Sequence, residues 1–396
     1  MAALPSDEKT VVVIGGGSGG LTLALALRQA GFPVQVYEQA PELAEVGAGI
    51  TLWYNAVRVL EHLDLAEAVR QVGLRANGGV IALHDGRMLV EASLEPFAAL
   101  GPLSELLVLH RAELQRALYD RLPPGTVRFN CRCTGYAHTE AGAVAHFEGR
   151  ASAPGWLVVG ADGLHSSIRA QLKGPEPPRY AGYICWRGVC PVPADWCGTT
   201  GEIWGKGDRF GVARLPGDRL YWFAVANAPQ GTQSPAGAAC KEALLQRFAR
   251  YAFDVPRILA ATPVEAIIFR EISDRRPVRG WSDGSVTLLG DAVHPTTPNM
   301  GQGAAMAMES ALVLVRCLRE HTELGAALRS YEATRAVRTQ RITNTSWTIG
   351  KMAHWESSLA RRMRNLMFER SPRKLRERQL REIVGYDAGR VPLAGG

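Results

Sequence analysis

A glycine-rich turn near the N-terminus restricts the fold of this chain more than any other feature of its sequence. The apolar run Val11 to Ile14 leads directly into Gly15-Gly-Gly17-Ser-Gly-Gly20, and Ser18 to Ala30 has helical spacing. A second apolar run, Val34 to Tyr37, ends at Glu38. The order strand, turn, helix, strand predicts a βαβ unit that begins a parallel sheet.

The turn has the residue types that a bound dinucleotide requires. Glycines permit a tight turn and a close approach of the backbone, and the free N–H groups at the start of a helix attract a pyrophosphate. An acid at the end of the next strand can accept hydrogen bonds from ribose hydroxyls. The candidate residues are Gly15, Gly17, Ser18, Gly19, Gly20 and Glu38. A glycine-rich turn without a ligand is the alternative, and the pattern alone does not distinguish NAD from FAD.

Two further motifs each follow an apolar strand. Gly160-Ala-Asp162-Gly163 continues to Arg169, and Gly290-Asp291-Ala-Val-His-Pro295 follows the strand from Val286 to Leu289. With the first motif, they make residues 10 to 345 resemble the group A flavoprotein monooxygenases, which include salicylate, urate and hydroxybenzoate hydroxylases and zeaxanthin epoxidase-like enzymes. The resemblance implies that FAD is the bound dinucleotide.

The resemblance also implies roles for individual residues. Asp162 and Arg169 belong to a motif that serves FAD and nicotinamide binding, and Asp291 accepts a hydrogen bond from the ribitol chain. The segment Gly47-Ala48-Gly49-Ile50 passes close to the isoalloxazine ring. Arg111 contacts FAD, and Cys133 lies near the adenine.

The sequence departs from the family pattern at two places. The family commonly has Pro-Asn-Ala where this chain has Tyr54-Asn-Ala56, which changes the pocket near the flavin. The family commonly has Glu-Arg where this chain has Glu38-Gln39. The change from arginine to Gln39 weakens one contact with the phosphate or adenine of the cofactor.

A third group of backbone donors precedes a predicted buried helix, Ala304 to Arg319. The segment Pro298-Asn-Met-Gly301-Gln-Gly303 stands directly before this helix. The backbone N–H groups of Gly301, Gly303 and Ala304 can therefore point at a ligand from the positive end of the helix. Such donors can stabilise the negative charge of a reduced flavin. A helix cap without a ligand is the alternative.

The resemblance implies an NAD(P)H- and O2-dependent hydroxylation. NAD(P)H reduces FAD, reduced FAD and O2 form a C4a-hydroperoxide, and its distal oxygen passes to a small aromatic or heteroaromatic substrate in an enclosed pocket. Arg209 and Tyr221 match pocket residues of urate hydroxylase-like members and are the candidate catalytic residues, which would bind the substrate or help to ionise it. Their alternatives are a solvated turn arginine and a half-buried sheet tyrosine. Aromatic residues of the same region form either pocket walls or ordinary core: Trp186, Trp204, Phe210, Tyr221 and Trp222.

The same cofactor also supports other activities. Epoxidation of an isoprenoid or another alkene, reduction of flavin without oxygen transfer, and flavin-based sensing all fit the FAD motifs. A disulfide reductase would need a second dinucleotide motif and cysteines near the first, and neither is found. His294 is a candidate acid or base, with a role in shaping the flavin loop as its alternative.

The chain length and the order of the motifs predict more than one domain. A chain of 396 residues exceeds the usual size of one hydrophobic core. We expect an α/β fold with an α+β insert: a Rossmann-like FAD-binding domain of the glutathione-reductase and hydroxybenzoate-hydroxylase type, a β-sheet substrate domain and C-terminal helices. The expected ranges are 1–75, 103–175 and 276–345 for the FAD-binding domain, 76–102 and 176–275 for the substrate domain, and 346–396 for the C-terminal helices.

Composition restricts the partners. The net charge of +7 comes without a nucleic-acid recognition module, so we expect no nucleic acid and attribute the charge to steering of anionic substrates. The basic C-terminal segment, including Arg361, Arg362, Arg364, Arg370, Arg373 and Arg376, either contacts an acidic membrane or a partner subunit or packs on its own domain. We expect a monomer or a homodimer.

Cysteine usage and hydropathy indicate a cytoplasmic protein. Seven irregularly spaced cysteines favour reduced thiols, and Cys131 and Cys133 lack the second pair that a zinc site needs, so no metal is expected. The N-terminus lacks a signal-peptide pattern, and no transmembrane segment is expected.

Overall fold

The N-terminal βαβ unit is part of a six-stranded sheet. The computed structural model describes residues 9–43, 48–94 and 105–395. The strands of the sheet pair in parallel, apart from the antiparallel edge strand β18. In spatial order they are β18 (Ser282–Asp283), β19 (Val286–Leu288), β12 (Leu157–Gly160), β1 (Val11–Ile14), β2 (Val34–Tyr37) and β8 (Val127–Arg128). The central strands are apolar throughout because helices and the rest of the chain bury both faces.

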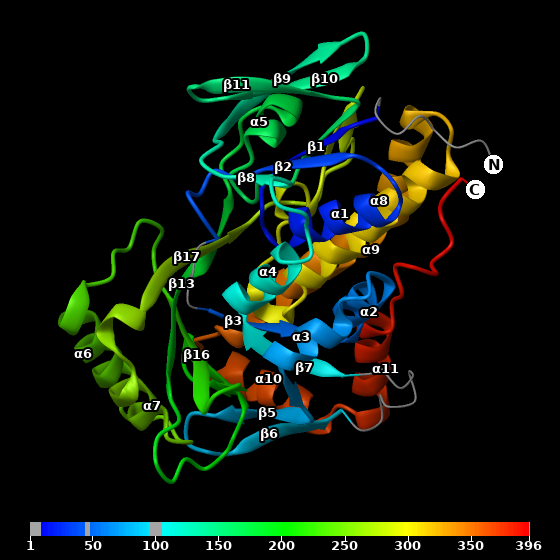
Figure 1. The fold of residues 1–396 in the computed structure, drawn as a ribbon. Helices are drawn as coiled ribbons and strands as arrows, with labels where there is room; N and C mark the ends of the chain where they lie inside the picture. Colours follow the sequence, from blue (N-terminus) through cyan, green and yellow to red (C-terminus); the bar gives the residue numbers. More distant parts are fainter. Residues whose placement is uncertain (1–8, 44–47, 95–104, 396) are drawn as a thin grey trace.

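The two helices that begin at the predicted glycine motifs pack against each other beside this sheet (Figure 1). They are α1 (Ser18–Gln29) and α8 (Gly303–Glu320). Almost all of α8 is buried, as its small and apolar residues require. Both N-termini therefore lie near the carboxyl end of the parallel strands, where this class of sheet binds ligands.

A seven-stranded sheet forms the second layer of the molecule. In spatial order its strands are β17 (Ile268–Asp274), β13 (Arg179–Pro191), β16 (Arg219–Asn227), β15 (Asp208–Leu215), β14 (Gly201–Trp204), β5 (Gly78–Leu83) and β6 (Met88–Ser93). Pairing is antiparallel except between β14 and β5. One face packs against α6 (Gly237–Arg247) and α7 (Val255–Ala261), which the sequence reading did not predict. The opposite face is directed toward the FAD-binding layer.

Shorter elements complete the two layers. One three-stranded sheet consists of β3 (Gly49–Leu52), β7 (Leu106–His110) and β4 (Leu74–Ala76), and another of β11 (Arg150–Gly155), β10 (Gly142–Phe147) and β9 (Cys133–Thr139). The remaining helices of this part are α2 (Tyr54–His62), α3 (Ala66–Val72), α4 (Arg111–Tyr119) and α5 (Ser167–Lys173), with the 3-10 turns η2 (Val264–Ala266), η3 (Gly290–Ala292) and η4 (Pro298–Met300).

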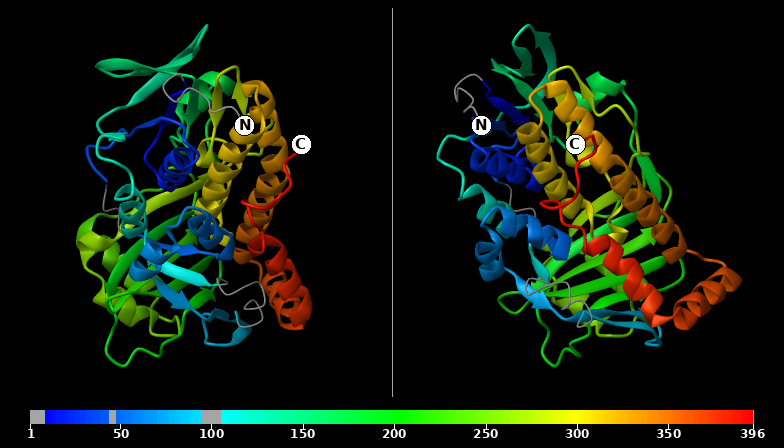
Figure 2. Two further views of the ribbon diagram at one scale, coloured as in Figure 1. Left: turned by 45° about the vertical axis from the view of Figure 1, so that its right-hand side comes forward. Right: turned by 90° about the vertical axis from the view of Figure 1, so that its right-hand side faces the viewer.

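Three helices end the chain: α9 (Leu324–Ala353), α10 (Ser358–Arg370) and α11 (Arg373–Val384). Figure 2 shows α9 running along α8, α10 turning away at the far end, and the last residues returning toward the N-terminal layer. The expected domain boundary at residue 346 falls inside α9, because no proline or cap interrupts that helix. We propose that the other boundaries follow the two large sheets. Within the described ranges, no helix combines the length and apolarity needed to cross a membrane.

Candidate active site

A cavity of about 360 Å³ lies between the glycine motifs and the inner face of the seven-stranded sheet. It brings together side chains and backbone from separate parts of the chain. The expected residues that line it are Gly17, Ser18, Gly19, Ala48, Gly49, Arg111, Gly163, Arg209, Tyr221, Asp291, Pro298, Gly301, Gly303 and Ala304. Gly47 lies outside the described residues. Motifs separated by nearly 300 residues in sequence thus converge on one site.

The N-terminal turn presents free backbone to the cavity. Gly15 has a φ of +109°, and a Cβ there would overlap the carbonyl oxygen of Ala161, while a Cβ at Gly20 would overlap the carbonyl of Gly15. These two glycines make the turn possible and do not line the cavity. A Cβ at Gly17, the N-cap residue of α1, would meet no atom within 4 Å, and no side chain caps the helix. The turn therefore fits a pyrophosphate.

The N-terminus of α8 lies at the same cavity. Its N-cap residue, Gln302, makes no capping hydrogen bond to the helix, and Gly301 turns the chain at a φ of +60°. Gly303 and Ala304 line the cavity at the first turn of this 18-residue helix. Two uncapped helix ends thus offer positive potential at separate points, as a ligand with two anionic groups requires.

Asp291 and Arg111 are the opposite charges of the cofactor half of the cavity. Asp291 is open to the cavity, but the surrounding protein leaves little bulk water, and this desolvation raises the pKa of its carboxyl group while Arg111 lowers it. Arg111 begins α4, and its backbone N–H donates to the carbonyl of Ala48 at 2.9 Å. Asp291 is therefore a hydrogen-bond acceptor directed at whatever fills the cavity.

Other expected cofactor residues lie outside the cavity. Glu38 accepts hydrogen bonds from the backbone of Gly16 at 2.6 Å and Ala40 at 2.8 Å, and Gln39 is exposed. Cys133 is half-buried in β9, where burial raises the pKa of its thiol. Their contacts with FAD remain predictions.

The Gly160–Arg169 motif supports the site from behind. Asp162 accepts the backbone N–H of Ser167, the first residue of α5, at 2.8 Å, and desolvation raises the pKa of its carboxyl group. Ser166 is the N-cap residue of this helix. Arg169 is buried and donates to the carbonyl of Ala292 at 3.4 Å, beside Asp291. In this structure the two side chains hold the backbone of the site, and only Gly163 of this motif's predicted residues reaches the cavity.

Strand alternation decides which side chains of the substrate sheet face the cavity. Trp186, Phe210 and Trp222 lie in the core against α6 and α7, so the interpretation of these residues as pocket walls is wrong and the core alternative holds. Trp204 is covered by α10, whose Phe368 contacts its ring edge-on at 5.1 Å. In β13, β15 and β16 the positions next to these core residues line the cavity instead: Cys185, Arg187, Arg209, Tyr221, Phe223 and Val225. Glu202 of β14 also lines the cavity, on the same face as Trp204.

Arg209 connects the substrate sheet to the loop before α8. It is 1% exposed, forms a 3.0 Å ion pair with Glu202, and also donates to the side-chain oxygen of Asn299 in η4. Asn299 in turn donates to the hydroxyl of Tyr183 at 3.0 Å. The solvated-turn alternative for Arg209 is therefore wrong, and this guanidinium is already committed to two protein partners.

Arg187 is a cavity residue that the sequence reading missed. It is half-buried, and among the described residues it has no carboxylate partner within ion-pair distance. Cys185 and, less strongly, Tyr221 hold the pKa of its guanidinium above the ordinary value despite burial. Burial raises the pKa of Tyr221 to about 12, although Arg187 lowers it. The alternation that places Trp186 in the core was the signal that could have identified Arg187.

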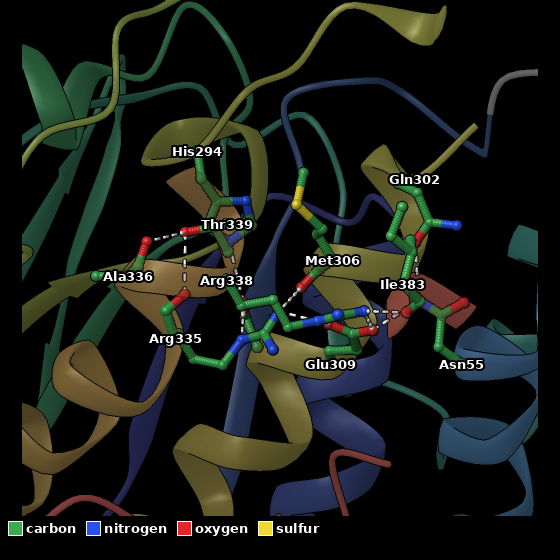
Figure 3. Close-up of polar contacts among 11 residues, drawn as sticks. Asn55, His294, Gln302, Met306, Glu309, Arg335, Ala336, Arg338, Thr339 and Ile383 are labelled. Carbon is green, nitrogen blue, oxygen red and sulfur yellow. Dashed lines mark hydrogen bonds and ion pairs between the residues drawn. The ribbon is translucent and has the colours of Figure 1, made fainter. Parts of the chain in front are cut away.

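A buried carboxylate beneath the α8 turn fixes its position (Figure 3). Glu309 accepts hydrogen bonds from Asn55 at 2.6 Å, Arg335 at 2.7 Å and Arg338 at 2.7 and 2.8 Å. Asn55 also donates to the side chain of Gln302 at 2.8 Å. Despite desolvation, the two arginines lower the pKa of Glu309 to about 2. The network ties the turn to α2 and α9.

His294 belongs to the support of this turn and not to the cavity lining. Its Nε2 lies 3.0 Å from the Ser310 hydroxyl, which also accepts from Arg335 at 3.1 Å. Burial and Arg335 lower the pKa of His294 to about 3. The imidazole is neutral near pH 7 and does not line the cavity, which favours the structural alternative over an acid or base.

The parallel sheet and the two uncapped helix ends at one cavity fit a protein that binds a dinucleotide. Residues 8–346 match the family described as "FAD binding domain", and the chain belongs to this family. Its relatives are FAD-dependent aromatic monooxygenases, and the protein is an FAD-dependent monooxygenase of the same kind.

Similarity extends over most of the chain. It is 39% identical to the aurachin C monooxygenase/isomerase of Stigmatella aurantiaca over 89% of this chain and 91% of that protein. It is 36% identical to the FAD-dependent urate hydroxylase of Klebsiella pneumoniae over 83% and 86%. The Klebsiella pneumoniae HpxO structure with FAD and uric acid has 29% identity and a TM-score of 0.90, covering 96% of this chain and 97% of that one.

Proposed function

We propose that this protein hydroxylates a small aromatic or heteroaromatic substrate that carries an ionisable oxygen, with NAD(P)H and O2 as co-substrates. One observation carries the proposal: the residues suited to FAD line the same cavity as Arg187, which has no carboxylate partner among the described residues. The named activities of the relatives, on urate and on 6-hydroxynicotinate, support a ring substrate with polar substituents.

The cofactor half of the cavity fits FAD. The α1 turn at Gly17 would hold the pyrophosphate, Asp291 would accept a hydrogen bond from the ribitol chain, and Gly303 would stabilise the reduced ring. When bound, FAD supplies hydride acceptance from NAD(P)H and activation of O2. The protein would contribute orientation of the substrate and, once cofactor and substrate fill the cavity between the two layers, exclusion of water.

The substrate half favours an anionic ring. Tyr221, with a pKa of about 12, remains protonated at neutral pH and acts as a hydrogen-bond donor, not as a base. Arg187 supplies a positive charge that lacks a carboxylate partner among the described residues, so an ionised substrate oxygen or carboxylate lowers the cost of burying it. An ionised ring is also more nucleophilic.

The polar lining disfavours the alternative substrates. An isoprenoid alkene would leave Arg187, which has no carboxylate partner among the described residues, without a polar ligand group, at a cost in desolvation. Epoxidation therefore requires a substrate that also carries a polar head. Seven free cysteines are consistent with a cytoplasmic location, since all are described and none forms a disulfide.

Stimulated NAD(P)H oxidation and product mass test the proposal together. The purified FAD-loaded protein is screened with NADH and with NADPH against hydroxylated and carboxylated rings, their neutral methyl ethers or esters, and isoprenoids. We expect the ionisable rings to accelerate oxidation and to gain one oxygen atom, which becomes labelled under heavy-isotope O2. Oxidation without any oxygenated product would instead support a flavin reductase. Binding of FAD without NAD(P)H oxidation would support a sensor.

A further inference from the structure

Helix α10 has an apolar stripe on its outer side. Leu359, Met363, Leu366 and Met367 are 42% to 69% exposed. Their spacing places them along one side of the helix. The opposite side buries polar residues, among them Arg364, which is 0% exposed. This arrangement is the reverse of that expected for a helix that packs only on its own domain.

The buried side fixes this orientation. Arg364 donates to the carbonyls of Ala353 at 2.9 Å and Met352 at 3.4 Å, and its guanidinium lies 4.9 Å from the ring centre of Trp204. Burial lowers the pKa of Arg364 to about 10, so the group stays charged at neutral pH. Rotating the helix to hide the stripe would break these contacts, and the stripe therefore faces outward as a fixed feature.

Positive charge surrounds the stripe. Residues 358–384 contain eight arginines, one lysine and three glutamates, a net charge of +6 in a chain whose net charge is +7. Arg362, Arg370 and Lys374 are exposed and have no ion-pair partner in the described part of the chain. Exposed apolar side chains beside unpaired cations form the surface that binds in the plane of an anionic lipid interface.

We propose that the outer side of α10, with the start of α11, docks on an anionic phospholipid surface. The stripe would enter the acyl boundary and the arginines would contact the headgroups. A second copy of the chain is a poorer occupant, because a twofold interface on this surface would bring two segments of +6 together. Anionic lipid instead complements both the charge and the apolar stripe.

Docking would place the bilayer beside the substrate sheet. The buried side of α10 contacts Trp204, whose indole donates to Glu202 at 2.9 Å, and Glu202 pairs with Arg209 of the cavity. Arg87, between β5 and β6, also lies 3.5 Å from Glu369 of α10. The helix thus joins the proposed lipid surface to the strands that line the cavity.

Vesicle co-sedimentation of the FAD-loaded protein tests the proposal. We compare neutral phosphatidylcholine vesicles with an equal mixture of phosphatidylcholine and phosphatidylserine. The triple variant Leu359→Gln, Met363→Gln, Met367→Gln should lose at least about tenfold in binding to the mixed vesicles. Replacing Arg362 and Arg370 by Gln should cost roughly fivefold per charge on the mixed vesicles only. The matched control is Val337→Gln, which changes an exposed apolar residue on α9 and should bind like the parent protein.

For each variant we also measure FAD content, turnover without vesicles, and molar mass by light scattering. The proposal requires unchanged FAD content and turnover in the triple variant, because none of its positions lines the cavity. Equal sedimentation of the parent protein with and without mixed vesicles would overturn it, as would undiminished binding of the triple variant. A dimer that the triple variant converts to a monomer would also overturn it and assign the stripe to a second copy.

Discussion

Gly49 and Tyr221 come from opposite walls of the cavity, and the tyrosine ring lies against the glycine so closely that a Cβ at position 49 would overlap it. Gly49 begins β3 on the cofactor side, and Tyr221 belongs to β16 of the substrate sheet. The absence of a side chain at position 49 therefore lets the two layers meet at the proposed site of oxygen transfer.

The substitution Gly49→Ala should displace the Tyr221 ring. Overpacking of this kind costs about 1–3 kcal/mol, and we expect a higher KM and lower kcat with FAD still bound. Steady-state kinetics and flavin content measure both effects. Gly79→Ala is the control, because its Cβ would make only ordinary contacts, the nearest at 3.6 Å. Kinetics of Gly49→Ala that match those of the control would contradict the predicted role of this contact.

Asp291→Ala should weaken FAD binding. The carboxylate faces the cavity, and a hydrogen bond to a charged group contributes about 1.5–3 kcal/mol, so we expect the Kd to rise by at least about tenfold. Titration of the apoprotein with FAD measures it. Asp283→Ala removes a surface carboxylate that lies 3.0 Å from His138 and should leave the Kd unchanged. An equal Kd for both variants would remove Asp291 from the cofactor site.

Arg187→Gln should weaken substrate binding, whereas Arg209→Gln should disturb the loop before α8. Loss of Arg187 should raise KM for an ionised substrate by about tenfold or more and leave the flavin spectrum intact. Loss of Arg209 frees Glu202 and Asn299, so the flavin spectrum or FAD affinity should also change. Stopped-flow binding and absorption spectra separate the two outcomes. A spectrum altered by Arg187→Gln alone would reverse the assignment.

Glu309→Gln should destabilise the folded protein. Arg335 and Arg338 would remain in the interior without a carboxylate, at a cost of about 3–5 kcal/mol. Denaturant unfolding measures the loss, and FAD affinity should fall because Asn55 and Gln302 share the network. The control Glu382→Gln removes an exposed carboxylate paired with Arg341 and should unfold like the parent protein. Equal stability of the two variants would show that the network does not support the turn.

Acidification should destabilise the protein before Glu309 titrates. Burial lowers the pKa of His294 and of His354 from 6.5 to about 3. Between these values the unfolded chain binds the protons, so stability falls as the pH falls below 6.5, by about 1.4 kcal/mol per pH unit for each histidine. Glu309, with a lowered pKa, loses its contribution only below its ordinary value of 4.5. Melting temperature against pH for His294→Asn should show a shallower slope; an unchanged slope would contradict the prediction.

Local sequence patterns predicted the strands and helices that surround the cofactor half of the cavity. The strands Val11–Ile14 and Val34–Tyr37 were predicted to the residue, and α8 begins one residue before the predicted start. These features depend on neighbouring residues: glycines where φ is positive, apolar runs in buried strands and a turn before a long helix.

The substrate half depends on tertiary register and could not be read in the same way. A one-residue shift in register moves all the side chains of a strand to the opposite face of the sheet. The sequence does not show which face of the sheet α6 and α7 cover. Trp186 was therefore considered as a residue of the cavity wall, whereas its neighbour Arg187 lines the cavity. Asp162 accepts the first backbone N–H of α5, because a motif residue can satisfy local donors before it reaches a ligand. The exposed stripe of α10 reverses the rule that places apolar residues inside.

A crystal structure with FAD and a ring substrate from the kinetic screen tests the central claim most directly. We predict the pyrophosphate at Gly17, the isoalloxazine between Gly303 and Gly49, and the substrate against Tyr221 with its ionised group at Arg187. FAD bound elsewhere, or a substrate that lies away from the inner face of the seven-stranded sheet, would contradict the account.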